Sequence, residues 1–261
     1  MKNWLCFVTI LMLCFQGLLG EATNFQQAQQ QMLRFGGAFK EVVVVSLGSH
    51  CEVANIFRTL GSRYFSTPVD WLLSLDHKGL ISLIDDKFKY LFDEKFLSYY
   101  PAGYVINSYY NIDFRHDWPD SDLHKHLPSI KEKYERRIER FFNLQELSNR
   151  VFFVRSAFDS NLNVLNNMPF YTPSCCIVTA AQAQELYDVL ERNFPHIKFI
   201  LVVINYDEEG VTPFLGLKNV IEFKVGKLHK EEDYRKFTPL LADLAFFDQI
   251  YTSTIKNLCK N

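Results

Sequence analysis

The sequence predicts a single-domain α/β protein in which a mostly parallel sheet is flanked by helices, a Rossmann-like layering. The chain has 261 residues, 48% of them hydrophobic and 22% charged, which is a globular composition. Short β-branched or apolar runs, typical of strands buried on both faces, alternate with helical patterns. No internal repeat and no Pro/Ser/Gly-rich linker divides the chain, so one domain is expected.

The elements are expected in an alternating order. The apolar runs predict strands at 42–47, 151–154, 199–204 and 220–223. Helical patterns are found at 52–60, 80–92, 128–147 and 179–193, and a last helix is expected from 234 or 239 to 258. Pro128 would lie in the first turn of its helix, where proline is tolerated. The aromatic, weakly alternating stretch 99–114 predicts one or two short strands.

The N-terminus has the pattern of a secretory signal peptide. Lys2 precedes an uncharged apolar run at 4–15, and small residues lead to an expected cleavage after Gly20. We therefore expect a signal peptide at 1–20, a polar leader at 21–40 and the α/β domain at 41–261. The mature protein would be periplasmic, cell-surface or secreted, without stable membrane insertion. An uncleaved N-terminal membrane anchor is the alternative.

Charge and cysteine content exclude several classes of protein. Twenty-eight Lys and Arg residues stand against thirty acidic ones, so no basic excess favours a nucleic-acid partner. After signal cleavage four cysteines remain, which is too few for a disulfide scaffold, and none forms a Cys-x-x-Cys pair for structural zinc. Cys175 and Cys176 are expected as buried residues, with a strained vicinal disulfide as the alternative. Cys259 is expected near a frayed end.

The first candidate site is the turn Ser46–Cys51, between the first expected strand and the first helix. Cys51 would lie at the helix N-terminus, where free backbone N–H groups and the helix dipole favour a thiolate. This edge of a parallel sheet is also where α/β proteins bind ligands. The position makes Cys51 a candidate nucleophile, and a buried structural cysteine is the alternative. The turn lacks the glycines of a dinucleotide fingerprint and the Gly-Lys-Ser/Thr of a P-loop.

The second candidate is the segment 116–126, which contains three histidines and three aspartates. In one interpretation His116 is a general base oriented by a carboxylate. In another, several of these side chains bind a divalent metal, although no third ligand has a recognisable spacing. The simplest interpretation is a polar loop before the Pro128 helix. No metal is expected.

The third candidate is Ser66–Trp71, in which a carboxylate is followed by a large aromatic ring. Asp70 would either cap a following helix or form hydrogen bonds into a site near Cys51. The sequence leaves both roles open.

Together the segments resemble a known family. Ser46-Leu47-Gly48-x-x-Cys51-x-x-Ala54, Pro68-x-Asp70-Trp71, His116-Asp117-Trp118 and Phe153-Val154-Arg155 occur in that order. They resemble the bacterial family described as "putative papain-like cysteine peptidases", over roughly 42–205. In that family Phe usually stands where this chain has Val69, and Phe where it has Trp118. The cysteine-to-histidine gap, from 51 to 116, is shorter than in papain, so a papain fold is not expected.

The resemblance implies a role for each motif. Cys51 would be the nucleophile and His116 its base, with Asp70 or Asp117 as the orienting carboxylate. The expected substrate-binding residues are Gly48, Ser49, Trp71 and Arg155. The implied activity is hydrolysis or acyl transfer on a peptide or other acyl substrate, without a cofactor.

Two further hypotheses come from other classes of protein. In one, an exported glycan-modifying enzyme uses Asp70, His116 and Arg155 to bind a sugar or phosphate, and Cys51 is structural. Tyrosines would then stack on carbohydrate; they are Tyr99, Tyr100, Tyr104, Tyr109 and Tyr110. In the other, the chain is a non-catalytic interaction protein on an enzyme scaffold. The sequence predicts no oligomeric state.

Overall fold

The computed structural model describes residues 42–49, 51–59, 65–100, 103–147, 150–157, 177–206, 217 and 219–225. All of them belong to one structural unit, Phe39–Asn261. Some of the expectations above lie outside the described residues: the signal peptide, the polar leader, Cys175, Cys176, Cys259 and the last helix.

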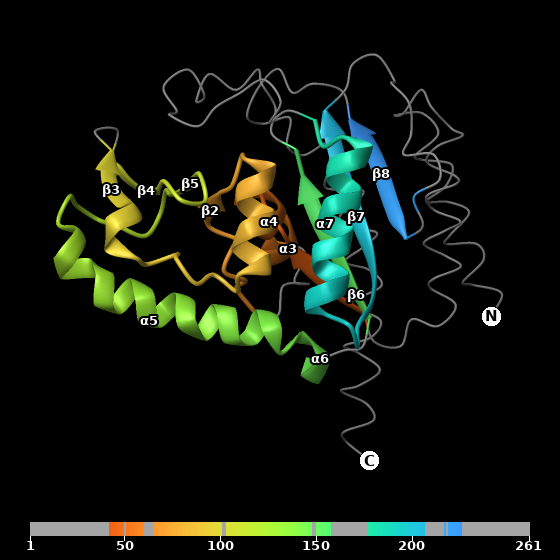
Figure 1. Ribbon diagram of the computed structural model, residues 1–261, viewed down its shortest axis with the longest axis horizontal. Helices are drawn as coiled ribbons and strands as arrows, with labels where there is room; N and C mark the ends of the chain where they lie inside the picture. The colour runs from red at the N-terminus through yellow and green to blue at the C-terminus, as the bar shows by residue number, and fades with distance from the viewer. Residues whose placement is uncertain are drawn as a thin grey trace. The chain divides into compact units, whose positions relative to one another are not determined.

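The main sheet has four parallel strands in the order β1-β6-β7-β8 (Figure 1). The strands are β1 (Val42–Ser46), β6 (Arg150–Ser156), β7 (Lys198–Tyr206) and β8 (Val220–Val225). Each predicted strand is present, with ends within two residues of the prediction. Phe152 and Phe153 of β6 and Leu201 of β7 are fully buried, as expected for central strands covered on both faces. The predicted mixed α/β fold is confirmed.

A second, antiparallel sheet was only partly expected from the sequence. Its order is β2-β5-β4-β3, with β2 (Leu72–Leu73), β5 (Ile112–Phe114), β4 (Tyr104–Asn107) and β3 (Leu97–Tyr100). Three of these strands replace the one or two predicted within the aromatic stretch. The four strands of this sheet are two to four residues long and are defined by pairing between neighbours, so no local periodicity marks them.

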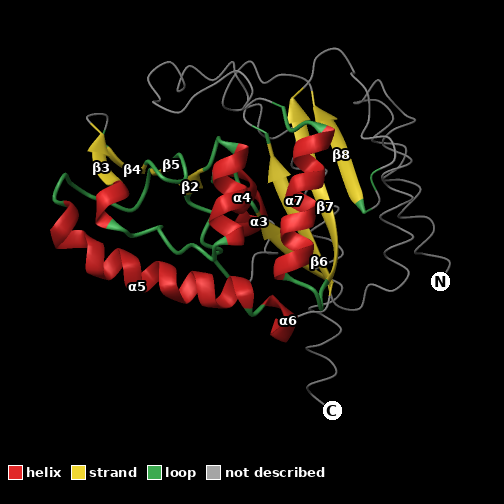
Figure 2. Cartoon of the chain, viewed as in Figure 1, coloured by secondary structure: helices red, strands yellow, loops and turns green. Residues whose placement is uncertain are grey.

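Helices cover the sheets, as Figure 2 shows. They are α3 (Glu52–Thr59), α4 (His77–Asp85), α5 (Leu123–Phe142), α6 (Leu144–Leu147) and α7 (Ala180–Asn193), with a 3₁₀ turn η1 (Glu94–Phe96). Helix α7 packs against β7 and against α4. Within the described ranges, no helix is both long and apolar enough to cross a membrane.

Helix α5 begins earlier than predicted. It starts at Leu123, and Pro128 lies inside it rather than in its first turn. The reason is the cap: the Asp122 carboxylate accepts a hydrogen bond from the Lys125 backbone N–H at 3.0 Å. Proline removes one intrahelical hydrogen bond, and the capped first turn together with the buried Leu127 and Ile130 offsets this loss.

Helix α4 is shifted toward the N-terminus relative to the predicted 80–92. Asp76 caps it by accepting from the Lys78 N–H at 3.1 Å, and it ends at Asp85. Lys87 and Phe88 then adopt positive φ angles of 58° and 63°, which end the helix. Phe88 is thereby buried, so tertiary packing overrides the helical pattern here.

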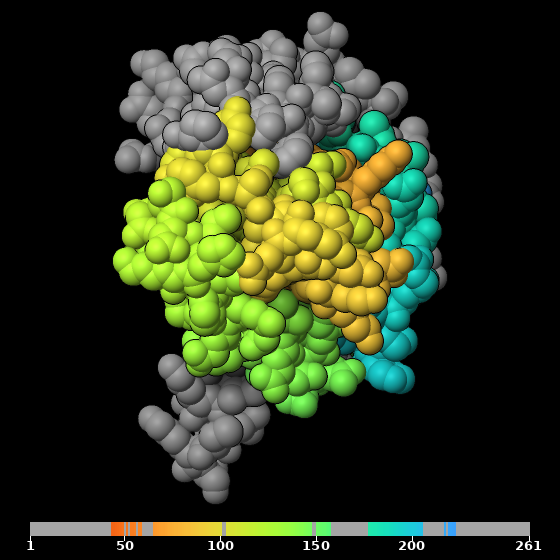
Figure 3. Space-filling view, turned by 60° about the vertical axis from the view of Figure 1, so that its left-hand side comes forward, coloured from red at the N-terminus to blue at the C-terminus, as the bar shows by residue number. Residues whose placement is uncertain are grey.

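Helix α5 connects the two sheets. Its buried Tyr134 ring packs against Phe114 of β5, with ring centroids 5.7 Å apart. Two turns later, Phe141 packs against Phe194 at 5.2 Å and Phe153 of β6 at 6.4 Å. Figure 3 shows the yellow-green α5 beside the yellow segment around β3. The same helix therefore fixes one sheet against the other.

A buried histidine lies where α4 packs on α7. His77 is 7% exposed, and its Nε2 is 4.0 Å from the carboxylate of Glu185. Burial, followed by the positive charge of Arg155, lowers the pKa of His77 from 6.5 to about 4. His77 is therefore neutral at physiological pH.

We expect His77→Phe to reduce the acid sensitivity of the fold. Between pH 6.5 and about 4 the unfolded chain protonates His77 and the folded chain does not, so stability falls as the pH drops through this window. Between pH 7 and 4.5 the wild type should lose about 2.5 kcal/mol more unfolding free energy than the variant. Urea unfolding at both pH values measures this. The matched control is His196→Gln, at an exposed position, and equal losses in wild type and His77→Phe would contradict the prediction.

Candidate active site

The turn after β1 is buried and continues the pairing with β6. The N–H of Leu47 donates to the Val154 carbonyl at 2.8 Å, and the N–H of Ser156 donates to the Gly48 carbonyl at 2.8 Å. Ser49 in turn donates its N–H to the Ser156 carbonyl at 3.2 Å. Gly48 has a φ of 81°, a conformation that favours glycine. The backbones of Gly48 and Ser49 are thus engaged by the protein itself.

Cys51 is the residue that precedes α3. The first hydrogen bond of this helix runs from the Asn55 N–H to the Cys51 carbonyl at 2.8 Å, so Cys51 occupies the N-cap position. As at the start of any α-helix, the N–H groups of residues 52–54 have no intrahelical acceptor and point toward the N-terminal end of the helix. Cys51 carries a thiol of intermediate exposure rather than a disulfide. The predicted strand–turn–cysteine–helix arrangement is therefore present.

Asp70 lies in a buried turn beside the end of β1. Its carboxylate is 1% exposed and accepts hydrogen bonds from the Thr67 N–H at 2.9 Å and the Thr67 hydroxyl at 2.6 Å. The same hydroxyl is 3.3 Å from the Ser46 carbonyl. Asp70 does not cap a helix, since β2 follows it. It fixes the turn that carries Trp71 against the end of β1.

Arg155 is buried beneath the site rather than exposed to a ligand. Only 2% of the side chain is exposed. Its guanidinium donates to the Leu47 carbonyl at 2.9 Å and to both the hydroxyl and the carbonyl of Ser74. Ser74 in turn donates its N–H to the Ser49 carbonyl at 2.7 Å. Arg155 therefore joins the ends of β1, β2 and β6.

Trp71 contacts both the last turn of α3 and the loop that carries His116. Its ring meets the His116 ring edge-on, with centroids 5.9 Å apart and an interplanar angle of 87°. The guanidinium carbon of Arg58, on α3, lies 5.9 Å from the Trp71 ring centroid. The helix that begins after Cys51 and the loop that carries His116 therefore contact the same aromatic ring. Three segments separated in the sequence meet here.

His116 is exposed, and the residues beside it are held by the protein. Asp117, 3% exposed, forms an ion pair with Lys133 and accepts from the Tyr134 hydroxyl at 2.7 Å. On the other side, Arg115 pairs with Asp113 at 3.1 Å. Among the described residues neither predicted orienting carboxylate, Asp70 or Asp117, forms a hydrogen bond with the His116 ring.

Electrostatics near this loop are dominated by burial. Desolvation raises the pKa of Asp113 to about 6, and the neighbouring Arg115 opposes the shift. Burial also raises the pKa of Tyr134 well above its ordinary value, followed by the charge of Asp117. Tyr134 therefore remains a hydrogen-bond donor at every physiological pH.

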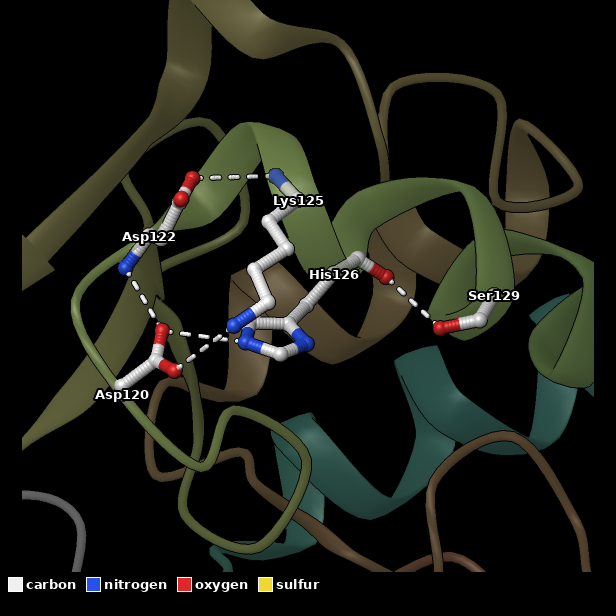
Figure 4. Close-up of polar contacts among 5 residues, drawn as sticks. All are labelled: Asp120, Asp122, Lys125, His126 and Ser129. Carbon is white, nitrogen blue, oxygen red and sulfur yellow. Dashed lines mark hydrogen bonds and ion pairs between the residues drawn. The ribbon is translucent and has the colours of Figure 1, made fainter.

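The remaining residues of the His/Asp segment stabilise the start of α5. Figure 4 shows Asp120 between the backbone N–H of Asp122, at 2.9 Å, and the His126 ring, at 3.0 Å. Lys125 forms an ion pair with Asp120 at 3.7 Å. His124 instead contacts Glu94 at 3.2 Å. In the ranges that the structure covers, no group of three potential metal ligands is gathered.

Several residues of this site were not singled out from the sequence. Thr67 had a local signal, because a Thr-x-x-Asp pattern often closes a turn by side-chain hydrogen bonds. No local sequence signal points to the other four residues, which are Ser74, Arg58, Lys133 and Tyr134. Their contacts join segments far apart in the chain, and a single sequence contains no record of them.

The fold and the site define an α/β protein with a cysteine at a strand-to-helix turn and an exposed histidine in the loop that follows β5 of the second sheet. The chain belongs to the family described as "putative papain-like cysteine peptidase (DUF1796)", which matches residues 42–209. The resemblance found in the motifs is therefore confirmed, and at this coarse level the family supports a cysteine hydrolase.

A curated relative extends the comparison without adding an activity. "Uncharacterized protein R408" of Acanthamoeba polyphaga mimivirus is 26% identical over 143 residues. The match covers 46% of this chain and 64% of that protein, so the chain spans less than two thirds of this relative. No solved structure matches the chain.

We expect Arg155→Lys to destabilise the protein in the absence of any ligand. An ammonium group cannot satisfy the carbonyl and hydroxyl acceptors that the planar guanidinium reaches together. The expected loss is about 2–4 kcal/mol of unfolding free energy, measured in urea. Arg192→Lys, at an exposed ion pair with Asp85, is the control and should cost under about 1 kcal/mol. A loss at Arg155 no larger than the control would contradict the structural role.

Proposed function

We propose that this protein is a thiol-dependent hydrolase or acyl transferase in which Cys51 is the nucleophile and His116 the base. The observation that supports this most directly is the shared contact at Trp71. It joins the loop of the exposed His116 to the helix that begins after the thiol. Family membership supports the same reaction class.

The reaction would proceed through a thioester. The Cys51 thiol gives its proton to His116, and the thiolate sulfur attacks an acyl carbonyl carbon, whose π electrons move to the oxygen. The N–H groups of residues 52–54 would stabilise this oxyanion. Gly48 and Ser49 are less suited to that role, since their N–H groups already donate to Ser46 Oγ and the Ser156 carbonyl.

The intermediate then collapses and the enzyme is regenerated. The bond between the carbonyl carbon and the leaving group breaks, and His116 returns the proton to the leaving group. Water, in a hydrolase, or an acceptor amine or alcohol, in a transferase, next attacks the thioester. It gives its proton to His116 and releases the Cys51 sulfur, which takes that proton back. Peptides and other acyl compounds are the proposed substrates, and no cofactor is required.

The glycan-modifying alternative has less physical support. It requires Arg155 to bind a sugar or phosphate, and the guanidinium is buried and donates to Leu47 and Ser74. Of the tyrosines proposed for stacking, Tyr104 and Tyr110 are buried in the protein and Tyr109 is 46% exposed.

Thiol reactivity tests the proposed function. We expect iodoacetamide to alkylate Cys51 with an apparent pKa below the ordinary ~8.5 of a thiol, and His116→Ala to shift that pKa upward. The rate at pH 7 should fall at least about 10-fold in His116→Ala. Peptide mapping by mass spectrometry assigns the modified cysteine, and loss of the fast phase in Cys51→Ser is the control. Equal profiles for wild type and His116→Ala would contradict the proposal.

We also propose that the chain is exported after cleavage following Gly20. The charged, apolar and small-residue regions of the first twenty residues support this. When the full chain is expressed in a bacterium with a C-terminal tag, we expect N-terminal sequencing of the periplasmic fraction to begin at Glu21. An intact N-terminus in the membrane fraction would instead support the uncleaved anchor.

A further inference from the structure

The loop that carries His116 is fixed on both sides by buried contacts, although the histidine itself is exposed. Before it, Arg115 pairs with Asp113 and its guanidinium lies 4.2 Å from the Tyr104 ring centroid. After it, the Trp118 ring packs edge-on against Phe114, 5.1 Å between centroids. Such contacts reduce the conformational freedom of the residue between them.

The strongest of these anchors runs through Asp117 to helix α5. Consecutive residues of this helix, Lys133 and Tyr134, both donate to the Asp117 carboxylate, one to each oxygen. Tyr134 is fully buried, and its ring is held by Phe92 at 5.3 Å and Phe114 at 5.7 Å. The hydroxyl donor therefore has little freedom to move, and the carboxylate that it binds is fixed in turn.

We propose that Lys133 and Tyr134 are positioning residues for His116 and act through Asp117. This inference rests on the proposed function. In the positioning role that we propose, Asp117 does not orient the His116 ring directly. It ties the backbone of the neighbouring residue to α5, so that the imidazole stays beside Trp71, the position from which the proposed function requires it to act on the thiol.

The test is the pH profile of Cys51 alkylation in Tyr134→Phe and Lys133→Gln. Tyr134→Phe keeps the buried ring and removes only the donor hydroxyl. With the anchor weakened, His116 should spend less time near Cys51, so the alkylation rate at pH 7 should fall about 3- to 10-fold. In the wild type, His116→Ala should shift the apparent pKa of Cys51 upward. In each variant the same substitution should shift this pKa by at most half as much.

A matched control separates positioning from general destabilisation. Tyr110 is also fully buried, and its hydroxyl also donates to a carboxylate, that of Asp86, at 2.6 and 2.7 Å. Tyr110→Phe should cost similar stability, measured by thermal unfolding, and leave the alkylation profile unchanged. Lys133→Arg keeps a cationic donor and should restore the profile lost in Lys133→Gln. Lys133 is 35% exposed, so both of its variants should fold even if Tyr134→Phe does not.

The outcomes of this test distinguish the positioning role from the proposed function. Reduced coupling in Lys133→Gln or Tyr134→Phe, with an unchanged control, supports the positioning role. If the wild type depends on His116 and the Lys133 and Tyr134 variants retain that dependence in full, the positioning role is wrong and the proposed function stands. An equal change in Tyr110→Phe also overturns the positioning role. If the wild type shows no dependence on His116, the proposed function fails and this inference fails with it.

Discussion

The candidate site depends on one buried guanidinium. Arg155 lies near the end of β6. Its guanidinium donates to the carbonyl of Leu47, just after β1, and to the hydroxyl and carbonyl of Ser74, just after β2. A charged group that is 2% exposed costs free energy unless it finds acceptors, and both terminal nitrogens of the guanidinium donate to these chain segments. The turn that leads to Cys51 thereby has a fixed geometry, and the second sheet is joined to the first at the site.

Helix α5 provides the second connection between the sheets. Its central Tyr134 packs on Phe114 of the antiparallel sheet, and its C-terminal Phe141 packs on Phe153 of the parallel one. The loop of His116 follows β5 directly, and Asp117 binds this same helix. The position of the His116 loop relative to the parallel sheet is therefore determined by packing between layers. The local secondary structure of His116 does not determine it.

Backbone N–H groups and a buried guanidinium are positive groups at the turn after β1. The start of α3 presents backbone N–H groups, and the positive charge of Arg155 is close enough to contribute to the lowered pKa of the buried His77. Because His77 stays neutral, it adds no second positive charge near Arg155. His116, whose ring contacts Trp71, is exposed to solvent, as its proposed role of proton acceptor requires.

The sequence by itself determined the parallel strands, the helix after Cys51 and the family, because β-branched runs, caps and short motifs are local signals. It misjudged the start of α5 and the end of α4, where the Asp122 cap and the burial of Phe88 outweigh propensity. Only the tertiary structure decided which way the polar side chains face. Arg155 was expected at a ligand and is buried, since its acceptors come from residues more than eighty positions away in the chain. Contacts between distant segments depend on how the layers pack. The residues that flank each motif do not indicate this packing.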